Sequence, residues 1–343
     1  MFKVIKKAVA MLIVLALLLC FFGCDRGSGN VQTTPAPTND GSQLSATNTD
    51  TTTAQLANVY DFTFSKRDVR EKYDEAKAIV ALSDGATTVN GDGVIIDGDI
   101  ITFTSDGVYY VSGVLTNGKL VVNTTKDEKV QLILNGVDVH CNDGAAIEVW
   151  QADKVFITLA SNTSNRLSDG NEYAATDIGS NACIFSKEDL TINGSGGLTV
   201  TGNYRHGISS RDDLVIALCT LNVTAVADGL RGKDCVKITE SNIIVNAVSD
   251  AIISDNTDEE WRGYVYVESG NLNLTAGTDG IQAETVVLIE GGNINIVTGG
   301  GSMNAIQNTD NEFSGFGNGF MGGMSQMGGI PQTGGSTTDE TQT

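Results

Sequence analysis

The chain has 343 residues, a formal net charge of −21 and 41% hydrophobic residues. A chain this acidic offers no basic face to neutralise phosphates, which argues against nucleic acid as a partner. It also disfavours direct capture of an anionic polymer unless cations bridge the two, and acidic extracellular proteins commonly hold Ca²⁺. The acidity is equally consistent with a role in solubility alone.

The N-terminus has the pattern of an export signal. Three lysines in the first seven residues precede an apolar run over 9–22 that is too short for a comfortable membrane span, and Gly23-Cys24 follows. This order resembles a bacterial lipoprotein signal and predicts cleavage after residue 23 with a lipid on Cys24. Phe21 departs from the preferred pattern, so an ordinary signal peptide or an uncleaved anchor is the alternative. We expect the protein on the extracellular face of the cell, lipid-anchored to the membrane.

Composition divides the rest of the chain into three parts. Residues 24–58 are rich in Thr, Asn and Ser, which predicts a disordered stalk, because such a stretch cannot bury enough surface to offset its ordering entropy. Residues 311–343, rich in Gly, Met and Thr, are expected to form a disordered tail. The region 59–310 between them is long enough for one large core.

The segment 65–83 has helical periodicity. Ser65 is a candidate N-cap, and Val69, Tyr73, Ala76 and Val80 recur at helical spacing. We expect a short N-terminal capping helix here, covering the first strands of the repeat that follows, because exposed terminal strands invite pairing with other chains.

A small-Gly-apolar motif recurs through the second half of the chain. The basic step is 22 residues, as from 206 to 228 to 250, with inserts in the longer intervals. Between the motifs, segments such as "DLVIALCTLNVTA" and "YVYVESGNLNLTA" alternate apolar and polar residues, which is the period of strands. Leucine-rich repeats share the step but need an L-x-x-L-x-L framework, and propeller blades are longer. The prediction is an all-β fold, a right-handed parallel β-helix with three short strands per turn.

Parallel coiling stacks equivalent residues of adjacent turns about 4.8 Å apart. Asn242, Asn271 and Asn293 share one position of the repeat. We expect them to form a hydrogen-bonded ladder with a structural role.

Four cysteines remain once the signal is removed and Cys24 is lipidated. Export permits two disulfides among them, in three connectivities. Buried thiols inside the coil are the favoured interpretation, because free cysteine is a highly buried residue type. The residues are Cys141, Cys183, Cys219 and Cys235.

Several segments of the repeat resemble those of a known protein family. "SKEDLTINGSGGLTVTG", "HGISSRDDLVI", "ADGLRGKDCVKI" and "TDGIQAET" resemble the secreted bacterial carbohydrate-binding domain-containing proteins, and the likeness runs from about residue 60 to residue 301. The resemblance implies a right-handed parallel β-helix similar to that of pectate lyases. It also implies binding of cellulose and acidic plant polymers, bound Ca²⁺ and no established catalysis.

Three successive turns carry a carboxylate two residues before the apolar anchor of the motif: Asp228, Asp250 and Asp279. Bare carboxylates stacked in this way would repel one another, and a Ca²⁺ ion between neighbours would relieve the repulsion. Asp255 and Glu284 follow these turns and are second-tier ligand candidates. The alternative is turn chemistry, in which the glycine of Asp-Gly takes a positive φ.

Basic residues follow the apolar anchor of the motif in neighbouring turns. Arg231 is a candidate clamp for a substrate carboxylate, and Lys233 is a further substrate-binding candidate. A calcium-dependent lyase needs a strong base beside the metal-bound uronate, and Lys233 and Arg211 are the candidates for that role. Acidic neighbours alternate with these residues, so mutual neutralisation on a solvated edge is the alternative.

An insert between Asp250 and Asp279 carries Trp261 beside a cluster of acidic residues. A tryptophan on such a loop suits stacking under a pyranose ring, with the acids near cations. Packing of the ring over the coil explains the residue equally well.

Taken together, these features favour a cell-surface, calcium-dependent polysaccharide-binding protein that is not an enzyme. The expected partners are cellulose and acidic polymers of the polygalacturonate type. The first alternative is a calcium-dependent pectate or polysaccharide lyase, and the second is a structural or adhesive surface spacer.

Overall fold

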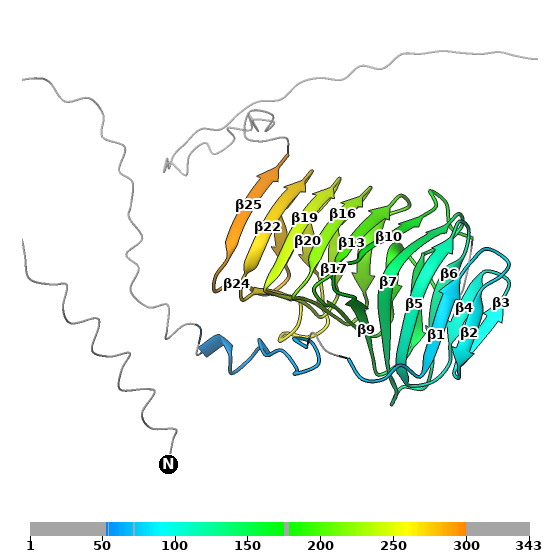
Figure 1. Ribbon diagram of the computed structural model, residues 1–343. Helices are drawn as coiled ribbons and strands as arrows, with labels where there is room; N and C mark the ends of the chain where they lie inside the picture. The colour runs from blue at the N-terminus through cyan, green and yellow to red at the C-terminus, as the bar shows by residue number, and fades with distance from the viewer. Residues whose placement is uncertain (1–52, 54, 71–72, 175–177, 300–343) are drawn as a thin grey trace, which may run out of the picture. The chain divides into compact units, whose positions relative to one another are not determined.

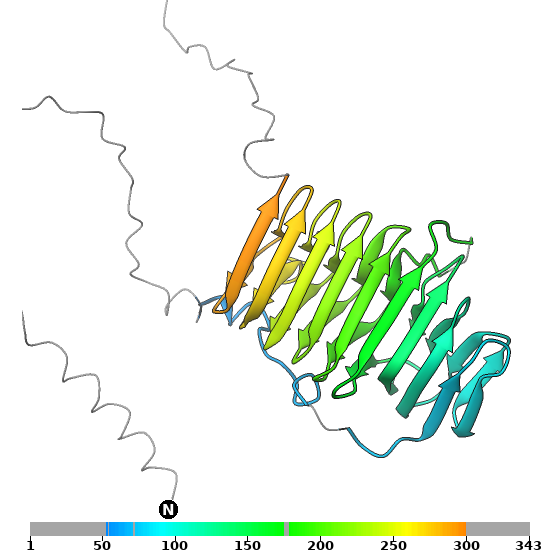
Figure 2. The same cartoon turned by 45° about the horizontal axis from the view of Figure 1, so that its top comes forward.

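The computed structural model describes residues 53, 55–70, 73–174 and 178–299. The chain coils into a parallel β-helix in which each turn from residue 147 onward contributes one strand to each of three faces (Figures 1 and 2). This confirms the predicted fold class. The predicted signal, Cys24, most of the stalk and the tail 311–343 lie outside the described residues. Within the described ranges no helix is long and apolar enough to cross a membrane.

The first face stacks parallel strands along the coil axis. It comprises β9 (Lys154–Leu159), β12 (Asp189–Asn193), β15 (Asp213–Ala217), β18 (Cys235–Thr239), β21 (Tyr264–Val267) and β24 (Val287–Ile289). The second face comprises β10 (Ser164–Asp169), β13 (Gly197–Gly202), β16 (Thr220–Ala225), β19 (Ser241–Ala247), β22 (Gly270–Ala276) and β25 (Asn293–Thr298). The long strand β7 (Lys129–Cys141) pairs with both β9 and β10 and so joins the two faces, and β5 (Gly107–Leu115) stacks before it.

The third face is a separate sheet. It comprises β4 (Ile100–Phe103), β6 (Lys119–Asn123), β8 (Ile147–Gln151), β11 (Ala182–Ser186), β14 (His206–Ser210), β17 (Leu230–Gly232), β20 (Ile252–Ser254) and β23 (Ile281–Ala283). The apolar anchors of the repeat stack in register here, Ile208 on Leu230 on Ile252 on Ile281. The first three of these are fully buried inside the coil, so the predicted repeat is the repeat of the core.

Two further sequence predictions are confirmed. Asn242, Asn271 and Asn293 are directly paired in successive strands, and Asn271 Nδ2 donates to Asn242 Oδ1 at 2.8 Å. The four cysteines are buried free thiols, and burial raises the pKa of each of them.

The predicted capping helix over 65–83 is wrong. The described part of this segment contains a turn after Ser65 and then β1 (Ala78–Leu82). Ala78, Val80 and Leu82 are buried and alternate with exposed residues, so the true period is two, and β1 extends β5 in parallel. The N-terminal end of the coil is instead closed by antiparallel pairs, β1 with β2 (Thr88–Gly91) and β3 (Val94–Asp97) with β4.

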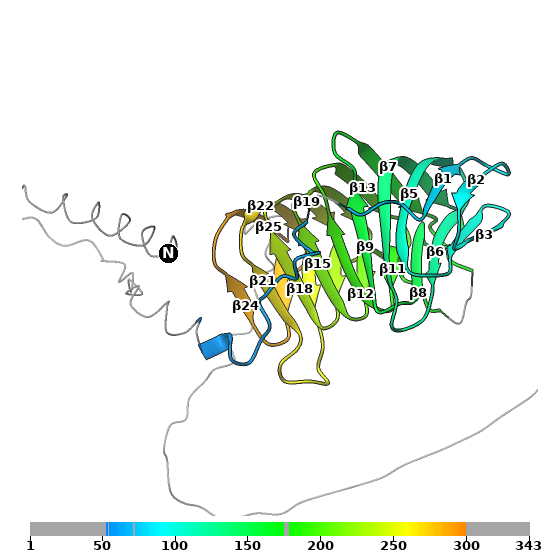
Figure 3. The same cartoon turned by 60° about the horizontal axis from the view of Figure 1, so that its bottom comes forward.

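The residues before β1 cross the outside of the first face, as the blue segment in Figure 3 shows. We call residues 55–70 the outer strap. The ring centroid of Phe62 lies 5.6 Å from that of Tyr264 and 4.9 Å from that of Tyr266. Further along, Asp68 accepts from Thr191 Oγ1 at 2.6 Å and lies 3.0 Å from Lys154 Nζ. The strap therefore crosses the strands of this face from β21 to β9 and buries their outward side chains.

Candidate functional site

A groove lies where the coil turns from the third face to the first. It has a volume of about 350 Å³ and is lined by Asn181, Ser209, Ser210, Arg211, Arg231, Lys233 and Asp255. We call it the basic groove. Four of these residues, Arg211, Arg231, Lys233 and Asp255, are candidates that the sequence singled out.

Arg231 is held in place by carboxylates on both sides. It lies on β17 between two buried residues, so strand alternation points its side chain outward. Its Nη1 lies 3.2 Å from Asp228 Oδ2 and its Nη2 pairs with Asp255. Asp228 also lies 3.1 Å from Nδ1 of the buried His206. Burial raises the pKa of Asp228, but His206 and Arg231 outweigh it, so that the pKa lies below its ordinary value.

The other two cations of the basic groove differ in their partners. Lys233 Nζ lies 2.8 Å from Asp258 Oδ2 on the following loop. Arg211 donates to the backbone oxygen of Gly179 at 3.2 Å and lies 5.3 Å above the ring of Phe185. Among the described residues Arg211 makes no ion pair, so its charge is the one most available to an anionic ligand.

Two oxygens at the basic groove are not satisfied by the chain. Asp255 Oδ1 and Asn181 Oδ1 are buried and have no hydrogen-bond partner among the described residues. A buried acceptor without a donor carries a desolvation cost, so these two oxygens are the least well satisfied polar atoms of the groove.

Trp261 lies beside a second hollow rather than in the basic groove. This hollow has a volume of about 240 Å³ and is lined by Val59, Asp61, Asp213, Asp234, Trp261, Arg262 and Tyr264. We call it the Trp261 pocket. Trp261 is 53% exposed, so its side chain does not cover the coil as a packed side chain would. The sequence did not place Asp213 and Asp234 together, because Asp213 is the first residue of β15 and Asp234 directly precedes β18, so they occupy different positions of the repeat.

The predicted calcium ligands make contacts of another kind. Asp228 Oδ1 accepts from the amide of Asp250 at 3.3 Å, and Asp250 Oδ1 accepts from the amide of Asp279 at 2.8 Å. Each carboxylate thus satisfies the equivalent amide of the next turn, while Asp279 and Glu284 are exposed. The calcium assignment of this set stays a prediction.

One acidic group that the sequence did not single out converges in space. Asp189, Asp212 and Asp213 offer carboxylate oxygens within 4.8 Å of one another, the one group of three such ligands among the described residues. Burial and the charges of Asp213 and Asp212 raise the pKa of Asp189 to about 6. The coil brings these acids together because Asp189 and Asp213 begin neighbouring strands, β12 and β15.

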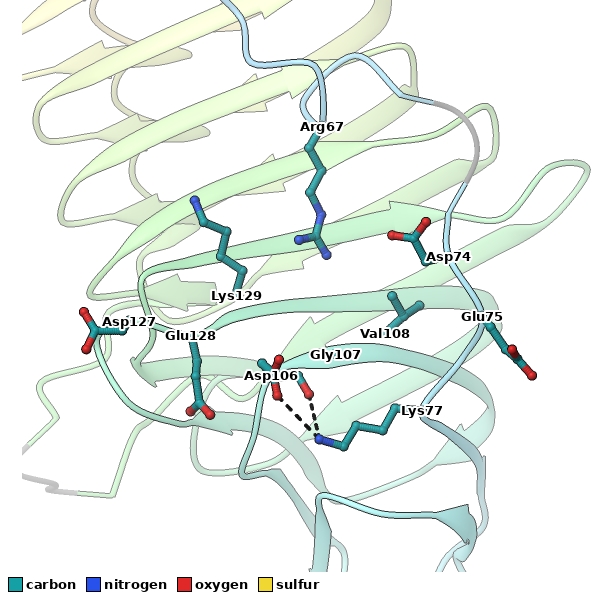
Figure 4. Close-up of a pocket in the computed structure, with 10 residues that line it drawn as sticks. All are labelled: Arg67, Asp74, Glu75, Lys77, Asp106, Gly107, Val108, Asp127, Glu128 and Lys129. Carbon is teal, nitrogen blue, oxygen red and sulfur yellow. Dashed lines mark hydrogen bonds and ion pairs between the residues drawn. The ribbon is translucent and has the colours of Figure 1, made fainter.

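A further hollow lies near the N-terminal strands of the coil (Figure 4). It has a volume of about 440 Å³ and lies between the start of β7 and the residues around Lys77, whose Nζ is 3.5 Å from Asp106 Oδ1. Its ten lining residues include five acids and three bases. Because the acids are in excess, this hollow is a weaker candidate for an acidic polymer than the basic groove.

Comparisons with known proteins agree with this architecture. Residues 97–326 match the family described as carbohydrate-binding domain-containing protein. A relative of that description from Acetivibrio thermocellus is 34% identical over 208 residues, which are 60% of this chain and 73% of the relative. A solved structure, described as the polysaccharide lyase-like protein from C. thermocellum in a gadolinium derivative, has 32% identity and a TM-score of 0.64. That match covers 66% of this chain and 93% of the solved chain. The chain therefore belongs to the family of carbohydrate-binding domain-containing proteins.

Proposed function

We propose that this protein binds polysaccharide at the cell surface and that the basic groove holds the carboxylates of an acidic plant polymer. The observation that carries the proposal is the convergence of Arg211, Arg231 and Lys233 in one groove of an otherwise acidic chain. Arginine binds carboxylates with strong, charge-assisted hydrogen bonds. Cellulose is the second polymer that we expect it to bind.

We propose Ca²⁺ as the cofactor of this binding. The support is the acidity of the chain and its two sets of neighbouring carboxylates, Asp228 with Asp250 and Asp279, and the trio Asp189, Asp212 and Asp213. The solved relative was prepared as a gadolinium derivative, and gadolinium is a hard cation that prefers oxygen ligands, as Ca²⁺ does.

Export and a lipid on Cys24 complete the proposal. The support is the series of lysines, apolar run and Gly-Cys at the start of the chain. Membrane retention should be lost on Cys24→Ala, and unchanged retention would point to an uncleaved anchor.

Replacing Arg211 with alanine should weaken polygalacturonate binding about tenfold to a hundredfold, because one charge-assisted hydrogen bond contributes about 1.5–3 kcal/mol. The measurement is calorimetric titration of the full chain with polygalacturonate oligomers in calcium and in chelator. Arg205→Ala is the matched control, since Arg205 is exposed and lines neither hollow. Equal affinities for both variants would remove the basic groove from the binding site.

Measurements with and without chelator distinguish the two proposed sets of Ca²⁺ ligands. Calcium at a hundredfold excess over its Kd should stabilise the fold by about 2.7 kcal/mol and so raise the melting temperature. Asp250→Ala should erase that gain if Asp228, Asp250 and Asp279 hold the ion, and Asp189→Asn should erase it if the trio does. A melting temperature that calcium leaves unchanged in the native chain would refute both.

A lyase activity is the second candidate function. The observation that favours it is the position of Lys233 and Arg211 at the groove that would hold the uronate. Ultraviolet absorbance of an unsaturated uronate product, lost in Lys233→Ala, would support it. Intact polymer after long incubation with calcium would exclude it for that polymer.

A further inference from the structure

The basic groove and the Trp261 pocket lie on either side of the same stretches of chain. Lys233 lines the basic groove and its neighbour Asp234 lines the Trp261 pocket. One turn earlier, Arg211 lines the basic groove and Asp213 lines the Trp261 pocket. Two residues span at most about 7 Å between Cα atoms, so one oligosaccharide is long enough to reach both hollows.

The two hollows have opposite charge. The basic groove has three cationic side chains and one carboxylate, a formal balance of 3 − 1 = +2. The Trp261 pocket has one cationic side chain and three carboxylates, a formal balance of 1 − 3 = −2. In the absence of a bound cation, a uronate carboxylate is attracted to the first and repelled by the second.

The Trp261 pocket has the chemistry for an uncharged sugar. Carboxylates accept hydrogen bonds from sugar hydroxyls, and the exposed indole ring offers an apolar face to a pyranose. Tyr264 and the strap residue Val59 add apolar surface to the same wall. These groups suit a neutral hexose.

Trp261 is carried by a loop that is pinned on both sides. Its neighbour Arg262 pairs with Asp234, and Arg262 Nε lies 3.3 Å from Glu259 Oε2. The buried Asn256 donates to Asp234 and accepts from the amide of Asp258 at 2.8 Å. An aromatic ring on a pinned loop loses little conformational entropy on binding, which favours a role in recognition.

We propose that the two hollows are adjacent subsites for a heteropolysaccharide in which a uronic acid neighbours a neutral hexose. The uronate occupies the basic groove and the neutral ring stacks on Trp261. This inference rests on the proposed function and narrows it, because neither polygalacturonate nor cellulose fills both subsites with the residue that each prefers.

The test compares three oligosaccharides of equal length by calorimetric titration of the full chain: an all-uronate oligomer, an all-glucose cello-oligomer and one in which uronic acid and neutral hexose alternate. The alternating oligomer should bind at least about tenfold more tightly than either of the others, a gain of about 1.4 kcal/mol. Trp261→Ala should abolish the preference for the alternating oligomer over the all-uronate oligomer and leave the affinity for the all-uronate oligomer within about twofold. Trp150→Phe is the matched control, since Trp150 lines neither hollow.

Three outcomes are separable. A preference for the alternating oligomer that depends on Trp261 supports the two subsites. Affinity for the alternating oligomer no higher than for the all-uronate oligomer overturns the inference and leaves the proposed function standing. Binding of none of the three oligomers overturns both.

Discussion

Replacing Asp68 with alanine should lower the free energy of unfolding by about 3–5 kcal/mol, because it leaves Lys154 buried without its partner. The side chain of Asp68 is 3% exposed and that of Lys154 is 13% exposed. The same carboxylate accepts from Thr191 Oγ1 and from the amide of Ser65, so the substitution also removes the polar contacts that hold the outer strap. Urea denaturation of the full chain at neutral pH measures the loss.

The pH dependence gives this prediction a second readout. Burial raises the pKa of Asp68, but Lys154, Thr191 and Ser65 together hold it below the ordinary value of 3.8. A depressed native pKa means that the contribution of Asp68 is complete above about pH 4 and is lost as the pH falls through the native pKa. The difference in stability between the native chain and Asp68→Ala should therefore be constant from about pH 5 to 8 and shrink in acid.

Two controls isolate the buried pair. Asp74→Ala breaks the exposed Arg70–Asp74 pair of the same part of the chain and should change stability by less than about 0.5 kcal/mol. The double variant Asp68→Leu with Lys154→Met should cost less than Asp68→Ala, because no buried charge is left unpaired. If Asp68→Ala and Asp74→Ala cost the same, the strap does not hold the first face.

The coil could be predicted from the sequence because the apolar pattern that specifies each turn is short and recurs along the chain. Ile208, Leu230 and Ile252 recur every 22 residues, and a wrong register would turn each of these side chains to solvent. Asn242 and Asn271 could be aligned in the same way. The prediction of a capping helix was wrong because four apolar residues lie at helical spacing, whereas the alternation that identifies β1 covers a shorter segment. The strand that pairs with β1, β5, lies about 30 residues away, so no local pattern reveals the pairing.

The candidate site was predictable only as far as it follows the repeat. Arg211 and Lys233 occupy equivalent positions, so the sequence brought them together, and Arg231 lies two residues from Lys233. Asn181 reaches the same groove through an irregular loop, which no periodicity describes. The wall that Val59 and Asp61 add to the Trp261 pocket depends on a strap contact about 200 residues away in the chain, as in the hydrogen bond from Tyr264 Oη to the backbone oxygen of Asp61.

The glycine of the Asp-Gly motif has a different role from the one that turn chemistry suggests. Gly229 does not have a positive φ. A Cβ built on it would lie 2.2 Å from Val245 Cγ1 and 2.7 Å from the backbone oxygen of Ala251. Gly207 meets Val223 Cγ1 in the same way at 2.3 Å. Glycine is thus required where a β-branched side chain of the second face meets the third face inside the coil.

Gly229→Ala should therefore lower the free energy of unfolding by about 3 kcal/mol, at the upper end of the cost of overpacking a core, since one of the two clashing atoms is backbone. One turn later, the equivalent position of the repeat tolerates a side chain. Ala251 occupies the equivalent position, and the register places Leu274 opposite it in place of a β-branched residue.

The pairing of Ala251 with Leu274 suggests a second substitution that should restore stability to Gly229→Ala. Val245→Leu moves the branch of the side chain from Cβ to Cγ, as in the turn of Ala251 and Leu274, and should recover at least about 1 kcal/mol of the loss in the double variant with Gly229→Ala. The same Val245→Leu change in the native chain should be neutral or mildly destabilising, so that the two substitutions are coupled with a favourable sign. Chemical denaturation of the four chains of this cycle measures the coupling. Additive effects would mean that the backbone of Ala251, and not the branch of Val245, excludes a side chain at position 229.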